Sequence, residues 1–237
     1  MLSRKIWGFI AVVVTGMAIA VIINLNYYSD PESAHNRSEN NVLRIINPAD
    51  VNPKLVDPSI QDQTKDHIIG EFSFLDQHGE EFTNANVEGK IFVTDFFFTT
   101  CAGICPKMTK QLQRVQKEFL DDDNFMILSH TVDPSYDSVR IMNTYAERFG
   151  AEYEKWRFLT GEKSELYIMA RKSYLVVPDE ADPDFEHGGE SDFLHTENFA
   201  LIDPDGRIRG MYDGTNPDEV SELIRDVYDL KKEYKLP

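Results

Sequence analysis

The sequence is poor in cysteine, because its 237 residues include only two, Cys101 and Cys105. They allow at most one disulfide, which outside the cytoplasm would ordinarily be interpreted as a structural bridge. That bridge would have three residues between its ends, and a crosslink that closes so short a loop stabilises a fold little. The pair is therefore better suited to redox or metal chemistry than to holding the fold together.

Positive charge is also scarce, because 24 Lys and Arg residues face 41 Asp and Glu residues, for a formal net charge of −17. Such a surface repels a polyanion, and no stripe of Lys or Arg is apparent in the sequence to offset the repulsion. Nucleic acid is therefore not an expected partner, whereas a cationic partner or a metal ion is compatible. Hydrophobic residues make up 41% of the chain, enough for a domain with a buried core.

Long hydrophobic runs are absent with one exception, residues 6–23. A helix of this length reaches about 27 Å, close to the ~30 Å hydrocarbon thickness of a bilayer. Arg4 and Lys5 precede the run, and no Lys or Arg follows until Arg37. The positive-inside rule then predicts a single-pass protein of the inner (cytoplasmic) membrane with its domain on the exported, periplasmic side.

A cleaved signal peptide is the alternative interpretation of this run. Ala18 and Ala20 form an A-x-A pattern, but residues 21–23 extend the apolar run beyond it, which favours an uncleaved anchor. The polar stretch that follows is typical of a tether. The predicted organisation is an anchor at 1–25, a tether and extended segment at 26–65, and a folded domain at 66–237.

The domain has the pattern of an α/β fold with a mixed central sheet and an N-terminal hairpin extension. We expect the hairpin at 72–75 and 81–83, strands at 91–98, 125–132, 156–159, 198–202 and 207–212, and helices at 105–119, 138–149, 164–174 and from 217. The cysteines lie where the strand at 91–98 ends and a helix begins. Ligands of open α/β sheets bind at that edge.

The spacing of the two cysteines favours a shared ion. Gly103 allows a tight bend between them, and Pro106 suits the first turn of the helix. The unpaired amides of a helix N-terminus are expected to lower the pKa of the thiols. Two close thiolates are soft ligands that select Cu(I), zinc or iron–sulfur clusters.

Two sulfurs leave a copper site incomplete, and six histidines are available as a third ligand. His35 lies in the tether and His78 in a turn, so we expect both in solvent, and His130 lies inside a strand and is expected to be packed. His195 and His187 flank an irregular stretch before the strand at 198–202. The pattern leaves both open as ligands and favours His195.

Several motifs resemble those of the Sco/SenC family, in family order and with compatible spacing. They are Phe97-Phe98-Thr99-Thr100-Cys101 with Cys105-Pro106, Thr131-Val132-Asp133-Pro134 with Asp137, Trp156-Arg157-Phe158-Leu159-Thr160-Gly161, and His195-Thr196 before Leu201-Ile202-Asp203-Pro204-Asp205-Gly206. The resemblance covers roughly residues 66–230.

The resemblance implies a thioredoxin-like fold tethered to a membrane. It implies one copper ion per domain, bound as Cu(I) or Cu(II) by Cys101, Cys105 and His195. It further implies a metallochaperone for the binuclear copper site of cytochrome c oxidase. The implied partners are the copper-bearing subunit of that oxidase and other copper or thiol carriers.

Asp133 and Asp137 match acidic positions of the family. We interpret Asp133 and Pro134 as the cap of the helix that starts near Ser138, and a role near the metal or in partner docking is the alternative. The sequence departs from the common pattern in a long acidic insertion at 178–194, which brings His187 close to the site in the sequence.

A thiol–disulfide oxidoreductase that reduces target cysteines is the alternative function. Such enzymes usually have two residues between their cysteines and a cis-proline facing them, whereas this chain has three residues and His195-Thr196-Glu197 at that place. A peroxidase of the peroxiredoxin type would need an arginine near one activated cysteine, and none is apparent. The pattern therefore favours a binding protein over an enzyme.

Overall fold

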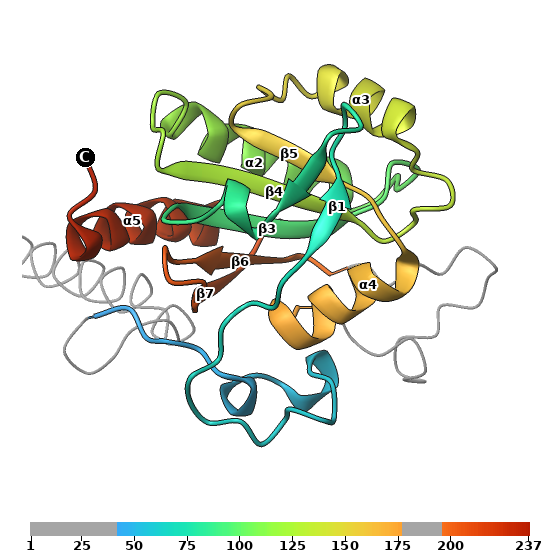
Figure 1. Cartoon of the computed structure of the whole chain (residues 1–237). Helices are drawn as coiled ribbons and strands as arrows, with labels where there is room; N and C mark the ends of the chain where they lie inside the picture. Colours follow the sequence, from blue (N-terminus) through green and yellow to red (C-terminus); the bar gives the residue numbers. More distant parts are fainter. Residues whose placement is uncertain (1–41, 177–195) are drawn as a thin grey trace, which may run out of the picture.

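A five-stranded sheet forms the centre of the computed structural model, which describes residues 42–176 and 196–237 (Figure 1). The strands are β3 (Ile91–Phe97), β4 (Phe125–Thr131), β5 (Trp156–Leu159), β6 (Asn198–Ile202) and β7 (Ile208–Asp213), in the order β5-β4-β3-β6-β7. β3, β4 and β5 are parallel, whereas β6 runs antiparallel to β3 and β7. The sheet is therefore mixed, as predicted, and the ends of β3, β4 and β5 share an edge with the beginning of β6.

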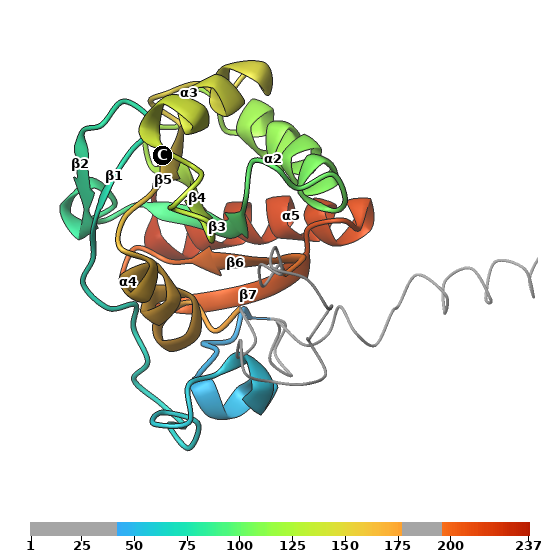
Figure 2. The same ribbon diagram turned by 90° about the vertical axis from the view of Figure 1, so that its right-hand side faces the viewer.

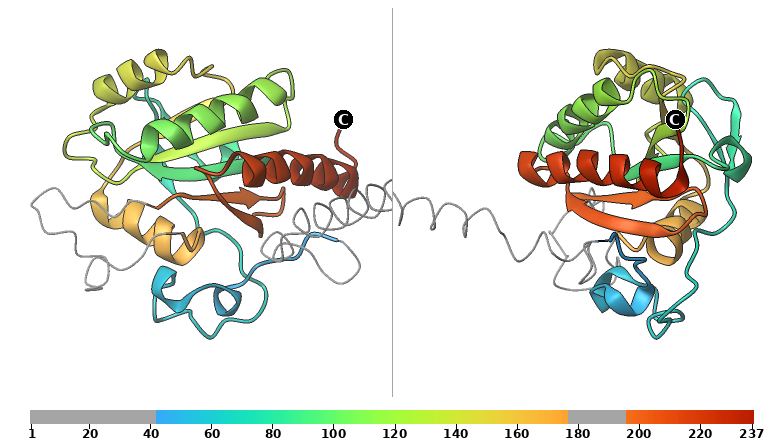
Figure 3. Two further views of the ribbon diagram at one scale, coloured as in Figure 1. Left: turned by 180° about the vertical axis from the view of Figure 1, so that it is seen from behind. Right: turned by 90° about the vertical axis from the view of Figure 1, so that its left-hand side faces the viewer.

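Three helices cover one face of the sheet, and shorter elements cover the other (Figures 2 and 3). The helices are α2 (Cys105–Glu118), α3 (Val139–Arg148) and α5 (Pro217–Tyr234). Every residue of β3, β4 and β5 is buried, which is why these strands appear in the sequence as nearly continuous apolar runs. This packing fixes the junction between β3 and α2, where the cysteines lie.

The predicted hairpin is present on the second face as β1 (Ser73–Leu75) and β2 (Glu81–Thr83), followed by a short 3₁₀ helix, η4 (Asn84–Asn86). Its turn contains Gly79 at φ 81°, in the left-handed region that glycine adopts without strain. Leu75 and Thr160 exchange backbone hydrogen bonds of 2.8 and 2.9 Å. The hairpin is thereby joined to the segment that leaves β5.

The helix expected at 164–174 is divided into two parts. The structure has a short α-helix, α4 (Lys163–Ile168), followed by a π-helix, η5 (Met169–Ser173). The carbonyl groups of Arg171 and Ser173 bond to residues outside the helix, the backbone N–H of Asp57 and the imidazole of His67. Within η5 the Tyr174 N–H donates to the Met169 carbonyl, five residues earlier, which is the π pattern. The carbonyls at the end of the helix have tertiary partners instead.

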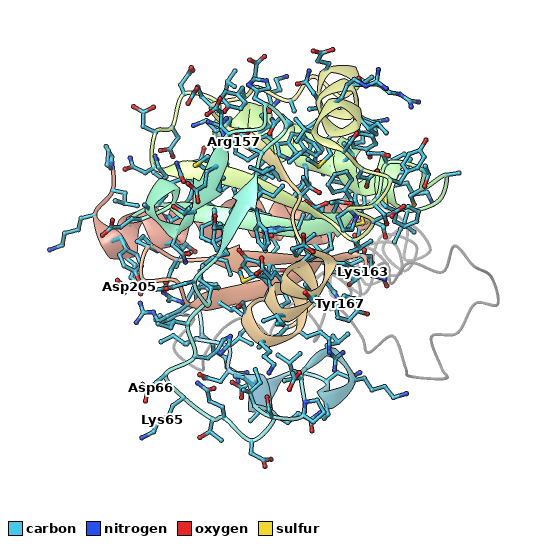
Figure 4. All side chains as sticks on the ribbon, turned by 45° about the vertical axis from the view of Figure 1, so that its right-hand side comes forward. Lys65, Asp66, Arg157, Lys163, Tyr167 and Asp205 are labelled. Atoms are coloured by element: carbon cyan, nitrogen blue, oxygen red, sulfur yellow. The ribbon has the colours of Figure 1, made fainter. Side chains whose placement is uncertain are left out.

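Residues 42–67, expected as extended chain, contain two 3₁₀ turns joined by irregular chain. The turns are η2 (Pro48–Asp50) and η3 (Pro53–Leu55), and Lys65 and Asp66 lie at the outer tip of this segment (Figure 4). The backbone N–H of Ile46 donates to the carbonyl of Ile208 at 2.9 Å, and Val56 is fully buried. The segment is therefore part of the folded domain's packing.

The predicted membrane helix at 6–23 lies outside the described residues. Within 42–176 and 196–237, no helix is both long enough and apolar enough to cross a bilayer.

Candidate functional site

The two cysteines lie side by side at the junction between β3 and α2. Cys101 is in the loop that follows β3 and is partly exposed, whereas Cys105 is the first residue of α2 and is 1% exposed. Neither forms a disulfide, and the Cys101 side chain is within hydrogen-bonding reach of the Cys105 thiol. The structure therefore brings together the two sulfurs that the sequence proposed as ligands.

The pKa of the Cys105 thiol is raised, so the predicted lowering by the helix N-terminus is wrong for this residue. Burial is the main cause, and the contact with Cys101 raises the pKa further, while a backbone hydrogen bond at Phe98 lowers it. The helix N-terminus lowers the pKa of a thiol only locally. Burial of Cys105 against the apolar residues of the helical layer raises its pKa and outweighs that effect. The metal-free Cys105 thiol therefore keeps its proton to a higher pH than an ordinary cysteine does.

Asp137 holds the chain immediately before Cys101 in place. Its carboxylate accepts a hydrogen bond from the Thr99 backbone N–H at 3.1 Å, a short one from the Thr99 hydroxyl, and one from the Thr131 hydroxyl at 2.6 Å. Burial raises the pKa of Asp137, and the bonds from Thr131 and Thr99 partly offset that increase. The carboxylate thus fastens the cysteine loop to the end of β4.

Asp133 has a different role from the one predicted. It caps a turn, since its carboxylate accepts from the Tyr136 N–H at 3.3 Å and its carbonyl accepts from the Asp137 N–H at 2.8 Å. Ser138 is the N-cap residue of α3. The helix-cap interpretation of Asp133 is therefore wrong, and its turn instead positions Asp137.

A buried carboxylate, Asp95, lies in β3 on the face that α2 covers, and the sequence analysis missed it. It is 2% exposed and accepts a short hydrogen bond from the Ser129 hydroxyl, which in turn accepts from the Trp156 indole N–H at 2.8 Å. Burial raises its pKa to about 7. Its charge is among the causes that raise the pKa of the Cys105 thiol. A single Asp within the apolar run of β3 was the signal available in the sequence.

Tyr145, from α3, is another polar group close to the cysteines. The Tyr145 hydroxyl bonds to the Thr109 hydroxyl at 2.9 Å, and Thr109 donates to the carbonyl of Cys105 at 2.7 Å. Burial raises the pKa of Tyr145, and the charges of Cys105 and Asp95 raise it further. The first turn of α2 is thereby tied to α3.

His195 and His187 lie outside the described residues, so their role as ligands stays a prediction, and the structure describes only the chain that follows them. Thr196 is buried, and its hydroxyl accepts from the Asn198 N–H at 3.1 Å at the start of β6. Because β6 is antiparallel to β3, its first residues lie at the edge of the sheet where β3 ends. Within 42–176 and 196–237, no group of three or more His, Cys, Asp or Glu residues is arranged to hold a metal ion.

His130 is packed, as predicted. Its ring lies 5.1 Å from that of Phe96 and 5.3 Å from that of Tyr174, and burial lowers its pKa to about 3. It belongs to the face of the sheet away from α2. His78 is exposed, as expected, and stacks on Tyr153 with 3.9 Å between the ring centroids.

The fold and the cysteine pair define a thioredoxin-like protein that presents two free thiols at the strand–helix junction of its sheet. The chain belongs to the SCO1/SenC family, whose model matches residues 60–230.

Relatives and solved structures agree with this assignment. The SCO1 protein homolog of Bacillus subtilis (strain 168) is 29% identical over 170 residues, which are 70% of this chain and 85% of the homolog. BsSco, described as a member of the Sco family of cytochrome c oxidase assembly proteins with a disulfide switch, has a TM-score of 0.60 and 27% identity over 74% of this chain and 98% of its own. ScoI of Arabidopsis thaliana, solved with copper bound, has a TM-score of 0.55 and 25% identity over 70% of this chain and 99% of its own.

Proposed function

We propose that this protein is a membrane-anchored metallochaperone that binds copper and helps to assemble the binuclear copper site of cytochrome c oxidase. Copper is its cargo, held as Cu(I) or Cu(II) by the sulfurs of Cys101 and Cys105 and the imidazole of His195. The observation that carries the proposal is the pair of adjacent free thiols at the sheet edge where β6 begins, since β6 starts three residues after His195.

The donor set suits copper. Thiolate sulfurs are soft ligands that select Cu(I), and an imidazole ligand also suits Cu(II). The pKa of the Cys105 thiol is raised by burial, so copper has to displace a proton that the metal-free protein retains. We therefore expect copper uptake to release protons and to weaken as the pH falls.

The relatives support this choice of cargo and target. The Arabidopsis thaliana ScoI structure contains copper, and BsSco belongs to a family of cytochrome c oxidase assembly proteins. By this likeness, the partners of the present chain are the copper-bearing subunit of the oxidase and other copper or thiol carriers.

The test is copper loading of the reduced protein, with stoichiometry measured directly and Cu(I) affinity measured against a competing chelator. We expect one copper ion per chain, and charge-transfer absorption from the thiolates when Cu(II) is bound. His195→Ala is expected to lower the affinity by more than the about 10–100-fold that loss of an outer-shell group costs. Unchanged affinity in that variant would refute His195 as the ligand.

Two further variants make the result specific. His187→Ala tests the second histidine of the acidic insertion, and we expect it to bind copper as the unaltered protein does. His78→Ala is the matched control, because this histidine is exposed and stacks on Tyr153 in the hairpin turn. Loss of binding in His187→Ala alone would move the third ligand to that residue.

Reduction of target cysteines is the second candidate function, favoured by the contact between two free thiols. The disulfide switch of BsSco supports it. A reductase would reduce a model disulfide stoichiometrically, with Cys101 and Cys105 ending as a disulfide. Efficient reduction by a protein that binds no copper would favour this function over the metallochaperone.

The anchor is part of the proposal. We propose that residues 6–23 form an uncleaved helix in the inner membrane, with the domain on the exported side. Recovery of the chain in the membrane fraction at its full mass, with the domain accessible to protease from outside the cytoplasm, is the expected result. Release of a soluble, shortened chain would support a signal peptide instead.

A further inference from the structure

Helix α2 presents four basic side chains as one exposed stripe, which the sequence analysis did not identify. Lys107, Lys110, Arg114 and Lys117 are spaced three and four residues apart and are all exposed, while Met108 and the other apolar residues of the helix are buried. The helix contains a single acidic residue, Glu118, in a chain whose net charge is −17. Positive charge is thus concentrated on the helix that begins at Cys105.

Lys107 and Lys110 are unfavourably placed for the helix itself, whereas Lys117 lies in the last turn, where the helix dipole favours positive charge. No acidic residue lies in the first turn, so the positive end of the helix dipole faces Lys107 without compensation. Like charges three and four residues apart repel each other along the helix. Among the described residues, none of the carboxylates forms an ion pair with Lys107, Lys110 or Lys117. Folding alone gives no reason for the positions of Lys107 and Lys110.

Arg114 differs from the three lysines because it has partners within the domain. Its guanidinium donates to the Ser221 hydroxyl at 2.9 Å and to the Pro217 carbonyl at 3.3 Å, and so joins α2 to the beginning of α5. The lysines have no such bonds within the described residues. They are the members of the stripe that face solvent with their charges uncompensated.

We propose that Lys107, Lys110 and Lys117 form a docking surface for an acidic patch on the protein that exchanges copper or electrons with the cysteines. Lys107 is two residues from Cys105, so a partner seated on the stripe lies next to the thiols. Attraction between opposite charges speeds the encounter and fixes its orientation. This inference deepens the proposed function by naming the chemistry of the partner's surface.

A local acidic patch on a protein fits the stripe better than an anionic membrane does. The exposed positions of α2 carry only charged side chains, whereas a membrane-binding helix places apolar residues in the lipid. An extended anionic surface would also meet the acidic remainder of this chain and be repelled. A small acidic patch contacts the stripe alone.

The experiment uses the full chain in a nonionic detergent and a fluorescent peptide of eight glutamates, with binding followed by anisotropy. A variant with Lys107→Gln, Lys110→Gln and Lys117→Gln is compared with a control in which Lys65, Lys232 and Lys235 are changed to Gln. The control removes the same charge from exposed positions outside α2, such as Lys65 (Figure 4). We expect the α2 variant to bind about tenfold more weakly than the control at about 0.02 M salt, and the difference to shrink at about 0.15 M.

Equal binding by the two variants, or no binding by the unaltered chain, would overturn the inference. So would lysine-dependent binding to phosphatidylglycerol vesicles without binding to the peptide, which would identify a membrane surface instead. Copper stoichiometry is measured on the same proteins. Because peptide binding needs no metal, failure of the stripe and failure of the copper site give different results.

Discussion

At the scale of single residues, Asp95 combines burial with an altered charge state. Its pKa is raised from 3.8 to about 7, so the stability that its neutral form contributes is complete below 3.8 and is lost as the pH rises through about 7. At about 1.4 kcal/mol per pKa unit, this contribution is at most about 4 kcal/mol. It acts against the usual gain in stability that ionised carboxylates provide as the pH rises.

Asp95→Asn is therefore expected to remove part of the pH dependence of folding. The amide oxygen can still accept from the Ser129 hydroxyl, so the contact with Ser129 and Trp156 is kept. Urea unfolding at a series of pH values should show the variant gaining stability relative to the unaltered protein between pH 4 and 8. A constant difference across that range would mean that Asp95 does not titrate there.

Asp137 gives a second prediction, because it connects the cysteine loop to β4. Asp137→Ala leaves the Thr99 N–H and two hydroxyl groups without their acceptor, and we expect a loss of about 3 kcal/mol in unfolding free energy. Copper affinity should fall as well, since Cys101 lies two residues beyond Thr99. Asp137→Asn should restore part of both properties, because it keeps one acceptor oxygen.

Asp133→Ala is the control for this prediction. It removes the carboxylate that accepts from the Ser135 hydroxyl and the Tyr136 N–H, but it keeps the Asp133 carbonyl that accepts from the Asp137 N–H and so leaves the acceptor of Thr99 in place. We expect some loss of stability with a smaller change in copper affinity. If both variants reduced copper affinity equally, the bonds to Thr99 would have no specific role.

The sequence predicted the location of the cysteines but not the pKa of Cys105. Three residues between two cysteines, followed by Pro106, are enough to place the pair at the start of a helix. The pKa of Cys105 depends instead mainly on burial in a cluster that includes residues distant in the chain, such as Tyr145 and Phe199, and the contact with Cys101 raises it further. The spacing of the two cysteines contains no information on burial. The pKa of Cys105 predicted from the helix N-terminus was therefore shifted in the wrong direction.

At the scale of elements, the strands were predicted more closely than the helix that precedes the acidic insertion. β5 coincides with the expected 156–159, because strong apolar patterns and turn residues mark its ends. The helix expected at 164–174 contains a π-helix, and the carbonyls at its end bond to Asp57 and His67, about a hundred residues earlier. Hydrophobic periodicity in a sequence indicates which face of a helix is buried. It does not indicate which backbone carbonyls have partners elsewhere in the fold.

At the scale of the whole molecule, the segment before the predicted domain contributes to its core. Leu43, Ile46 and Val56 are buried, and the Arg209 guanidinium donates to the Leu43 carbonyl at 3.0 Å. Each such side chain contributes about 1.5–3 kcal/mol when it is buried. The domain boundary at residue 66 remains a prediction, and these contacts argue for an earlier start.

Two shortened forms of the chain test this point. We expect the form beginning at residue 66 to be at least about 3 kcal/mol less stable to urea than the form beginning at residue 42. The physical reason is the exposure of apolar surface on the sheet, together with the loss of backbone acceptors for Arg209. Equal stability would show that the segment is dispensable for folding.

The position of the Ile46–Ile208 bridge has a geometric consequence. Phe92, Ile202 and Ile208 lie in register, so the upstream chain joins the sheet where β3 begins, whereas Cys101 follows the end of β3 (Figure 1). A strand of seven residues separates these ends by about 20 Å. With 6–23 in a bilayer, as proposed, residues 24–41 link the anchor to the end of the sheet away from the thiols. Fully extended, these residues span at most about 60 Å. The cysteine loop then lies at the end of the sheet opposite the point where the anchor is attached.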